Sequence, residues 1–315
     1  MLYPISVPKP NSAENLIGFI DGEGGVVVRP RYAGGSYFFE GKASVVEGNG
    51  GSGFINDEGK VVIPCRFKGL GRFRNGLCSI NGGFIDHSGK WLIEPRFLVA
   101  SEFSEGRAFV SLDGETFGFI DLRGQVVIQA DFQQCRLFSD GLAAVCRDDR
   151  WGFVDHIGEI RIPHVFESVR PQGFRSGLAA VQIDGRWGFI DHSGNFVVKP
   201  KYEDLNPFSE SLASVCRDGR WGMIDLDGTL VVDFKFTDLG GLERGMANAK
   251  LNGQAGFVYG NGSWAIQPIF DRCYCFFGNL AVVRQGDTYS YIRRNGEIVW
   301  TSEPGAFVQA PPAFL

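Results

Sequence analysis

Short runs of alternating apolar and polar residues follow one another along the chain, and glycine or proline interrupts nearly every run. The best-formed example is RWGFIDHSGNFVVKPKY, Arg186 to Tyr202. Trp187 and Phe189 share one face of an expected strand, because side chains alternate with a period of two residues. Such runs bounded by turn residues predict β-strands rather than amphipathic helices. We therefore expect an all-β protein.

The same pattern recurs at a regular spacing. Gly18 begins the first copy of Gly-Phe-Ile-Asp and Ser290 begins a degenerate ninth copy, which gives a mean period of 34 residues over eight intervals. Self-similarity at a fixed period is the signature of a repeat protein. We expect about nine units over residues 16–300, an N-terminal entry or cap at 1–15 and a Pro/Phe-rich tail or cap at 301–315. The other copies begin at Gly53, Gly83, Gly118, Gly152, Gly188, Gly222 and Gly256.

Each unit is predicted to contain three strands. The first two form a hairpin around an Asp-Gly turn such as Asp184-Gly185, and the third is a segment such as 196–202. Gly188 lacks a side chain, which suits the close approach of a neighbouring unit's backbone. Three strands of typical length fit a period of 34 residues, whereas WD-type propeller blades need four strands and about 40–45 residues.

These three-stranded hairpin or meander units favour a curved β-solenoid or superhelix. In such an array each unit buries its apolar face against its neighbour. A closed propeller-like ring is the alternative, because an open array leaves two sheet edges to protect. The sequence alone leaves both architectures open, with the open array favoured.

Asp191 and His192 resemble a catalytic or metal-binding pair. However, an Asp-x-x-Gly sequence also predicts a turn, in which the Asp side chain accepts a backbone hydrogen bond and the Gly tolerates a positive φ. The His position is Leu226 in another copy, a replacement that a catalytic pair would not permit. We therefore interpret the motif as a turn. The Asx positions are Asp21, Asn56, Asp86, Asp121, Asp155, Asp191 and Asp225.

Composition and charge narrow the classes of function. The 315 residues include 31 Lys and Arg against 36 Asp and Glu, a net charge of −5. This mild acidity argues against general binding of nucleic acid, which usually requires a basic surface. No apolar run has the length of a signal peptide or of a membrane span, so we expect a cytoplasmic protein that does not bind membranes.

Reactive side chains show no arrangement that departs from the repeat. The seven cysteines have no paired spacing, which favours reduced thiols in a cytosolic protein. Cys273 and Cys275 do not form a C-x-x-C motif. No phosphate-binding loop, metal-ligand spacing or nucleophile–base motif stands apart from the repeats. We therefore expect no cofactor, no metal and no catalytic residue.

The copies RWGFVD, RWGFID and RWGMID, each followed by a turn, resemble the WG repeat, also called KWG, of bacterial all-β repeat proteins. The resemblance covers about residues 16 to 300, although Ile17, Ser52, Gly82, Phe117 and Ala255 replace the tryptophan in other copies. It implies a non-enzymatic scaffold without catalytic residues to transfer. The residues that define the repeat are Trp151, Trp187, Trp221, Gly152, Gly188, Gly222, Asp155, Asp191 and Asp225.

A candidate binding ladder follows the ends of the third strands. Stacked at the repeat spacing, its cations would form a basic stripe for an acidic peptide, a phosphate-bearing ligand or a glycan. The simpler alternative places the aromatic residues in the core and leaves the cations solvated beside acidic side chains. The basic members are Arg31, Arg66, Arg96, His164, Lys201 and Lys235, and the aromatic neighbours include Tyr32 and Tyr202.

From these features we expect a non-catalytic scaffold that binds another protein, in an adaptor, regulatory or immunity-type role. The first alternative is a glycan or small-ligand module that uses aromatic residues between repeats. A glycoside-active enzyme is the remaining alternative. Neither nucleic acid nor a membrane is an expected partner.

Overall fold

The computed structural model describes residues 1–9, 12, 14–69 and 71–306. These residues form 35 strands and no helix, which confirms the all-β prediction. The strands build nine small antiparallel sheets, numbered here in chain order, in agreement with the nine predicted units. Among these residues no helix is long and apolar enough to cross a membrane. Most of the predicted tail, 307–315, lies outside the described residues.

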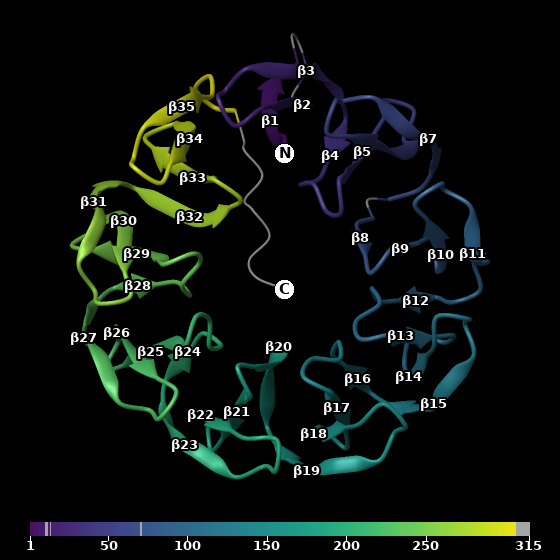
Figure 1. The fold of residues 1–315 in the computed structure, drawn as a ribbon, viewed down its shortest axis with the longest axis vertical. Coiled ribbons are helices and arrows are strands. Elements are labelled where there is room, and N and C mark those ends of the chain that lie inside the picture. Colours follow the sequence, from purple (N-terminus) through teal and green to yellow (C-terminus); the bar gives the residue numbers. More distant parts are fainter. Residues whose placement is uncertain (10–11, 13, 70, 307–315) are drawn as a thin grey trace. The chain divides into compact units, whose positions relative to one another are not determined.

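The chain divides into two compact units, whose strands are labelled in Figure 1. Unit 1 combines Met1–Arg96 with the segment from Phe270 onward and holds sheets 1, 2, 3 and 9. Its strands are β1 (Tyr3–Pro8), β2 (Asn15–Ile20) and β3 (Val26–Tyr32) in sheet 1; β4 (Gly34–Gly35), β5 (Lys42–Val46), β6 (Ser52–Asn56) and β7 (Val61–Phe67) in sheet 2; β8 (Phe73–Arg74), β9 (Leu77–Ile80), β10 (Gly83–Asp86) and β11 (Trp91–Ile93) in sheet 3; and β32 (Arg272–Phe277), β33 (Leu280–Gln285), β34 (Thr288–Arg293) and β35 (Ile298–Thr301) in sheet 9.

Unit 2 spans Phe97–Ile269 and holds sheets 4 to 8. Its strands are β12 (Val99–Ala100), β13 (Ala108–Ser111), β14 (Phe117–Ile120) and β15 (Val126–Phe132) in sheet 4; β16 (Gln134–Cys135), β17 (Ala143–Arg147), β18 (Arg150–Val154) and β19 (Ile160–Phe166) in sheet 5; β20 (Ser168–Arg175), β21 (Leu178–Ile183), β22 (Arg186–Ile190) and β23 (Phe196–Tyr202) in sheet 6; β24 (Asp204–Leu205), β25 (Leu212–Arg217), β26 (Arg220–Asp225) and β27 (Leu230–Phe236) in sheet 7; and β28 (Asp238–Leu239), β29 (Met246–Leu251), β30 (Gln254–Tyr259) and β31 (Trp264–Phe270) in sheet 8.

The prediction of three strands per unit is wrong for eight of the nine sheets, which have four strands. The extra strand lies between the last strand of the preceding sheet and the hairpin, and in most sheets it has only two residues. In sheet 7 it consists of Asp204 and Leu205, which pair with Cys216 and Val215. A four-stranded sheet therefore fits a period of 34 residues because one of its strands is so short.

The prediction of a β-solenoid or superhelix is also wrong. Each strand pairs only with strands next to it in sequence, so the described residues form nine separate sheets rather than sheets that continue from repeat to repeat. In addition, sheets 1 and 9 pack against each other within unit 1. The Tyr291 hydroxyl donates to the Pro4 carbonyl at 2.8 Å, and the Asn279 N–H donates to the Tyr3 hydroxyl at 3.1 Å. The closed propeller-like alternative requires this contact, whereas an open array leaves its first and last units free.

The segment 1–15, expected to form an entry or cap, supplies β1 as a strand of sheet 1. A side chain of β1 also contributes to the contact with sheet 9. Tyr3 is buried, and its ring centroid lies 5.7 Å from that of Tyr291. Burial of the Tyr291 hydroxyl raises the pKa of this group well above its usual value. The first and last parts of the array are therefore joined by a buried aromatic contact.

The glycine of each Trp-Gly pair allows the backbones of the third and fourth strands to approach each other very closely. A Cβ atom on Gly188 would lie 2.4 Å from the Val198 carbonyl oxygen. The pairing register shifts at this glycine: Trp187 pairs with Tyr202, whereas Phe189 pairs with Val198. The close approach predicted for Gly188 thus comes from the fourth strand of its own sheet and not from a neighbouring unit. Gly152 and Gly222 have the same surroundings.

The hydrophobic core lies between consecutive sheets. One cluster joins Trp187, Phe189 and Val198 of sheet 6 to Phe208 and Ile224 of sheet 7, all of them buried. Such burial of large side chains is the main source of stability, at about 1.5–3 kcal/mol for each side chain. Each sheet therefore depends on its neighbour for its core, as expected of a repeat protein.

Candidate functional site

The Asp-x-x-Gly motif forms the turn between the third and fourth strands. Asp191 Oδ1 accepts hydrogen bonds from the backbone N–H groups of Asn195 and Ser193, both at 2.9 Å. These donors lower the pKa of the Asp191 carboxyl group. Gly194 has a φ of +81° and donates its N–H to the Asp191 carbonyl at 3.0 Å. The turn interpretation is therefore confirmed, and Asp155 and Asp225 make the same contacts.

The glycine of each turn also packs against the preceding sheet. A Cβ atom on Gly228 of sheet 7 would lie 2.8 Å from a methyl group of Val198 in sheet 6. On Gly262 of sheet 8 it would lie 2.6 Å from a methyl group of Val232 in sheet 7. The turn therefore needs glycine both for its backbone conformation and because the fourth strand of the preceding sheet leaves no room for a side chain.

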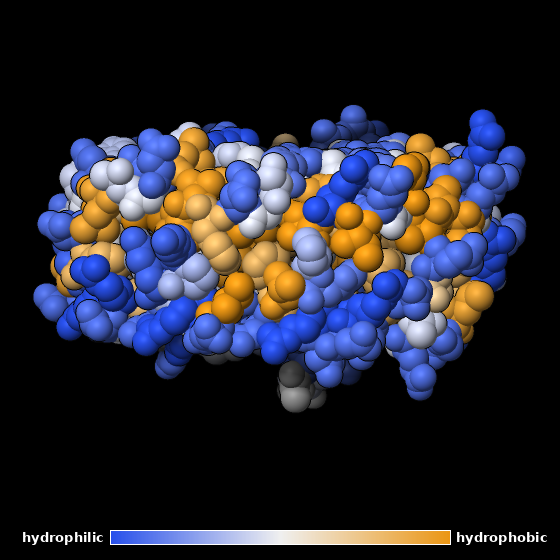
Figure 2. Space-filling view, turned by 90° about the horizontal axis from the view of Figure 1, so that it is seen from below, coloured by the Kyte–Doolittle hydropathy of each residue, from blue (hydrophilic) through white to orange (hydrophobic). Residues whose placement is uncertain are grey.

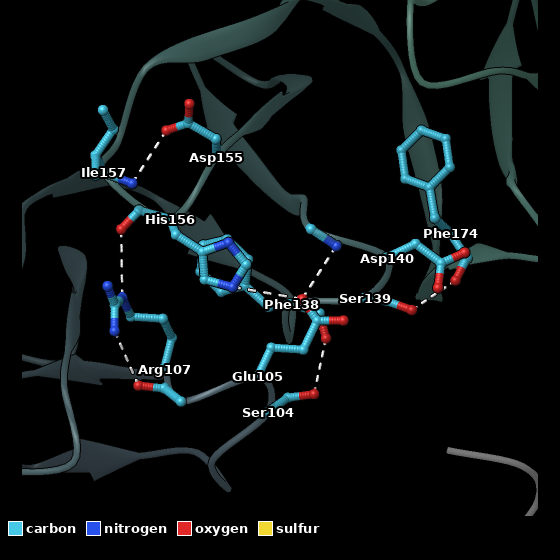
Figure 3. A network of polar contacts seen from close by, with 12 residues as sticks. Ser104, Glu105, Arg107, Phe138, Ser139, Asp140, Asp155, His156, Ile157 and Phe174 are labelled. Atoms are coloured by element: carbon cyan, nitrogen blue, oxygen red, sulfur yellow. Dashed lines mark hydrogen bonds and ion pairs between the residues drawn. The ribbon is translucent and has the colours of Figure 1, made fainter.

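The histidines beside the turns contact an aromatic ring and a carboxylate. The His156 ring stacks on Phe138 with centroids 4.3 Å apart, and His156 Nε2 lies 3.4 Å from Glu105 Oε2 (Figure 3). The same carboxylate oxygen accepts the Gly141 N–H at 3.0 Å. In unit 1, His87 stacks on Phe73 at 4.5 Å and faces Glu40. These side chains join a turn to the loop of the preceding sheet.

Serine side chains provide a second set of contacts between sheets. Ser104 Oγ donates to the Phe138 carbonyl at 2.8 Å, and Ser139 Oγ donates to the Phe174 carbonyl at 2.5 Å (Figure 3). Ser209 Oγ makes the equivalent contact with the Leu242 carbonyl at 2.7 Å. Sequence reasoning missed this row of contacts, although the recurring Ser-Glu or Ser-Asp after a phenylalanine was its signal. The loops that carry these residues therefore hold the sheets together.

One of these loops has an unfavourable residue. Ser211 adopts a φ of +69°, whereas the equivalent loops of sheets 4, 5 and 8 have Gly106, Gly141 and Gly245 there. A left-handed conformation costs a non-glycine residue about 1–2 kcal/mol.

We expect Ser211→Gly to stabilise the protein by about 0.5–1 kcal/mol, because the relief of strain exceeds the added entropy of the unfolded chain. Urea denaturation measures this change. The reverse substitution Gly141→Ser is the control and should destabilise by a similar amount. Equal midpoints for both variants and the wild type would contradict the prediction.

Two tryptophans of the repeat, Trp151 and Trp187, each lie beneath an arginine from the first strand or from the residue after it. The Arg170 guanidinium lies 4.3 Å from the ring of Trp187, and that of Arg136 lies 4.6 Å from the ring of Trp151. Both tryptophans are buried. Arg170 also forms an ion pair with Asp204 of the next sheet. These tryptophans therefore serve packing within the sheets.

The predicted binding ladder has exposed cations but buried aromatic rings. Arg31, Arg66 and Arg96 lie at the ends of the last strands of sheets 1, 2 and 3 or just beyond them, and Lys201 and Lys235 lie on successive fourth strands in unit 2. Tyr32 and Tyr202 are each only 3% exposed. The row is also interrupted, since Asp131 and Val165 occupy the corresponding positions of sheets 4 and 5. His164 lies half-buried next to that gap.

Several ladder cations are engaged in contacts within the fold. Arg66 Nη2 donates to the Gly89 carbonyl at 2.8 Å, and Lys235 Nζ donates to the Gly262 carbonyl at 3.3 Å. In each case the acceptor belongs to the turn of the following sheet. Arg31 Nη2 donates to the neighbouring Tyr32 hydroxyl at 2.8 Å. Lys201 differs, since its Nζ lies 5.2 Å from the Tyr202 ring centroid and has no carboxylate partner among the described residues.

The last strand of each sheet, called the outer strand here, exposes apolar residues at its start. In unit 2 the exposed residues include Val126, Ile160, Val197 and Val231, each 40% exposed or more. These strands lie on the outside of unit 2 (Figure 1). Figure 2, seen from the side of β19 and β23, shows hydrophobic side chains at the surface among hydrophilic ones. The outer strands therefore present a repeated, partly apolar surface.

The cysteines and acidic groups show no arrangement for metal binding in the described ranges. Five of the seven cysteines are buried, and all seven are free thiols. Burial raises the pKa of the Cys135 and Cys273 thiols, which disfavours the reactive thiolate. Within residues 1–9, 12, 14–69 and 71–306, no group of three His, Cys, Asp or Glu side chains is placed to hold a metal ion.

Comparison with solved structures gives a match over the full length. A structure described as the crystal structure of the eukaryotic initiation factor matches with a TM-score of 0.65 and 10% identity, covering 100% of this chain and 98% of that chain. BamB from Moraxella catarrhalis matches at a TM-score of 0.48 and 12% identity, covering 84% of this chain and 94% of that chain. The first match shows a shared fold and nothing about function, and the second is too weak to carry an argument.

Comparison of sequences identifies the family. No curated protein matches this chain. A family model described as "WG containing repeat" matches eight segments: 17–50, 53–81, 83–115, 117–151, 151–187, 187–221, 221–254 and 256–289. These segments cover most of the chain, and each contains the last two strands of one sheet and the first two strands of the next. The chain therefore belongs to the WG repeat family.

Proposed function

We propose that this protein is a non-catalytic scaffold that binds another protein through the outer strands of its repeats. The observation that carries the proposal is the repeated exposure of apolar residues on these strands, such as Val126, Val197 and Val231. Exposed apolar patches rimmed by polar residues are typical of sites of protein interaction. Membership of a repeat family supports the proposal, because arrays of similar units provide extended binding surfaces.

The polar residues of the turns and loops support the same assignment. Asp191, Glu105 and Ser139, which resemble catalytic groups in sequence, are held in contacts that form turns or join sheets. We further propose an adaptor, regulatory or immunity-type role in the cytoplasm. We do not propose glycan binding at the ladder, because Tyr32 and Tyr202 are buried and offer no ring face to a sugar.

The proposal predicts a partner that depends on the outer strands. We expect affinity capture of the full chain from extracts of its native host to recover one recurrent protein. The triple variant Val126→Thr, Val197→Thr and Val231→Thr should lose that protein, because it removes exposed apolar contacts at little cost in stability. Capture followed by mass spectrometry measures both results.

A matched control changes exposed apolar residues that lie in the turns instead. Leu122 and Ile157 are 45% and 69% exposed and lie outside the outer strands. The double variant Leu122→Gln and Ile157→Gln should retain the partner. Recovery of no partner by the wild type, or equal loss from both variants, would count against the proposal.

A further inference from the structure

The outer strand β23 combines apolar and basic residues in a way that its neighbours do not. Val197, Lys199 and Lys201 alternate along the strand and all three are exposed, so they share one face. Phe196, at the start of the strand, is 38% exposed and packs its edge against Phe166 of sheet 5. In β27 the position of Lys199 is occupied by Asp233, which gives that strand a mixed charge.

The two lysines of β23 are also free of acidic partners. Neither Lys199 nor Lys201 forms an ion pair with a carboxylate in the part of the chain that the structure describes. The neighbouring cations are engaged, since Arg161 of β19 pairs with Asp155 at 2.7 Å and with Glu159 at 3.1 Å. Two unpaired positive charges beside an exposed valine are therefore specific to this outer strand within unit 2.

The backbone of β23 has a free edge. On one side β23 pairs with β22, and on the other side no strand among the described residues pairs with it. A free strand edge carries unpaired N–H and C=O groups that an extended peptide can use. Pro200 has no N–H and limits backbone pairing to the stretch before it, Phe196–Lys199.

We propose that β23 binds an extended acidic peptide by strand addition along Phe196–Lys199. One acidic side chain of the peptide faces Lys199 within the paired stretch, and a second, two residues further along, reaches Lys201 beyond Pro200. The spacing follows from strand geometry, because alternate side chains of a paired strand lie on the same face as those opposite them. An apolar side chain of the peptide contacts Val197. This inference rests on the proposed scaffold function and names the chemistry of its partner.

The test uses the full chain and a fluorescent ten-residue peptide of alternating glutamate and valine. Anisotropy titration should show saturable binding that weakens as salt is raised, since exposed ion pairs are screened. The variant Lys199→Glu and Lys201→Glu should bind this peptide about tenfold more weakly, because two attractive pairs become repulsive. A peptide with lysine in place of glutamate should not bind.

The matched control reverses two other exposed cations by the same amount of charge. Arg123 lies in a turn and Arg220 lies at a hairpin, both away from β23. The double variant Arg123→Glu and Arg220→Glu should keep the affinity for the peptide within about twofold of the wild type. A peptide with a central proline should bind about tenfold more weakly if backbone pairing contributes. Equal weakening by both double variants, or undiminished binding of the proline peptide, would overturn the proposal.

Two further outcomes separate this proposal from its alternatives. If phosphatidylserine vesicles bind through Lys199 and Lys201 and the acidic peptide does not bind, the ligand of β23 is an anionic lipid surface and the peptide proposal is wrong. A native partner whose capture is unchanged by Lys199→Glu and Lys201→Glu would overturn this inference while leaving the scaffold function in place. Loss of that partner on the same substitutions would support both.

Discussion

Gly188→Ala is expected to destabilise the protein by about 3 kcal/mol, although it adds only one methyl group. The new Cβ would lie 2.4 Å from the Val198 carbonyl oxygen and 2.7 Å from the Pro200 nitrogen. Both neighbours are backbone atoms of β23, so neither can move without disturbing the pairing of sheet 6. Thermal unfolding followed by circular dichroism should show a midpoint lower by about 6 °C, at about 2 °C for each kcal/mol.

A glycine without such neighbours provides the control. Gly241 has no atom within 4 Å of the place that a Cβ would occupy, and it does not have a positive φ. Gly241→Ala should therefore change the stability by less than about 0.5 kcal/mol. Gly222→Ala should repeat the large effect, because its Cβ would lie 2.4 Å from the Val232 carbonyl oxygen. Similar midpoints for Gly188→Ala and Gly241→Ala would disprove the explanation.

Gly24→Ala is expected to disrupt the contact between sheets 1 and 9, at a cost of about 3 kcal/mol. The added Cβ would lie 2.0 Å from the Val299 carbonyl oxygen of β35, and the φ of Gly24 is +87°. Hydrogen exchange measured by mass spectrometry should show faster exchange in β1–β3 and β32–β35. Sheets 5 and 6 of unit 2 should keep their protection, since their packing does not involve this contact.

Another glycine of the same turn gives a close control. Gly22 has no atom within 4 Å of the position of a Cβ and no positive φ. Gly22→Ala should leave both stability and exchange close to those of the wild type. A uniform rise in exchange along the chain for Gly24→Ala would show that the effect is not confined to the junction.

The parts of the fold that were predictable from the sequence are those set by neighbouring residues. The turn at Asp191 depends on groups within four residues of it, so its motif was sufficient. The short strand of Asp204 and Leu205 left no signal, because two residues cannot show an alternating pattern. The contact of Tyr291 with Pro4 spans 287 residues of sequence, and the repeat pattern contains no information about it.

The candidate site was predicted in part for the same reason. Alternation places Lys201 and Tyr202 on opposite faces of β23, which explains why the cation is exposed and the ring is buried. A ladder that used both residues on one surface was therefore incompatible with a strand. The free state of Lys199 and Lys201 depends on which carboxylates lie nearby in space, and only the structure provides that information.

The contacts of Ser139 and Glu105 have a consequence for how such a chain can change in length. Ser139 and Phe174 are 35 residues apart, and Glu105 and Gly141 are 36 residues apart, so each donor and its acceptor occupy neighbouring positions of the same loop in successive repeats. A gene duplication that copies one whole repeat supplies a new donor for every new acceptor. An insertion of part of a repeat breaks this match. Addition of whole repeats therefore preserves the hydrogen bonds between successive sheets, whereas addition of part of a repeat does not.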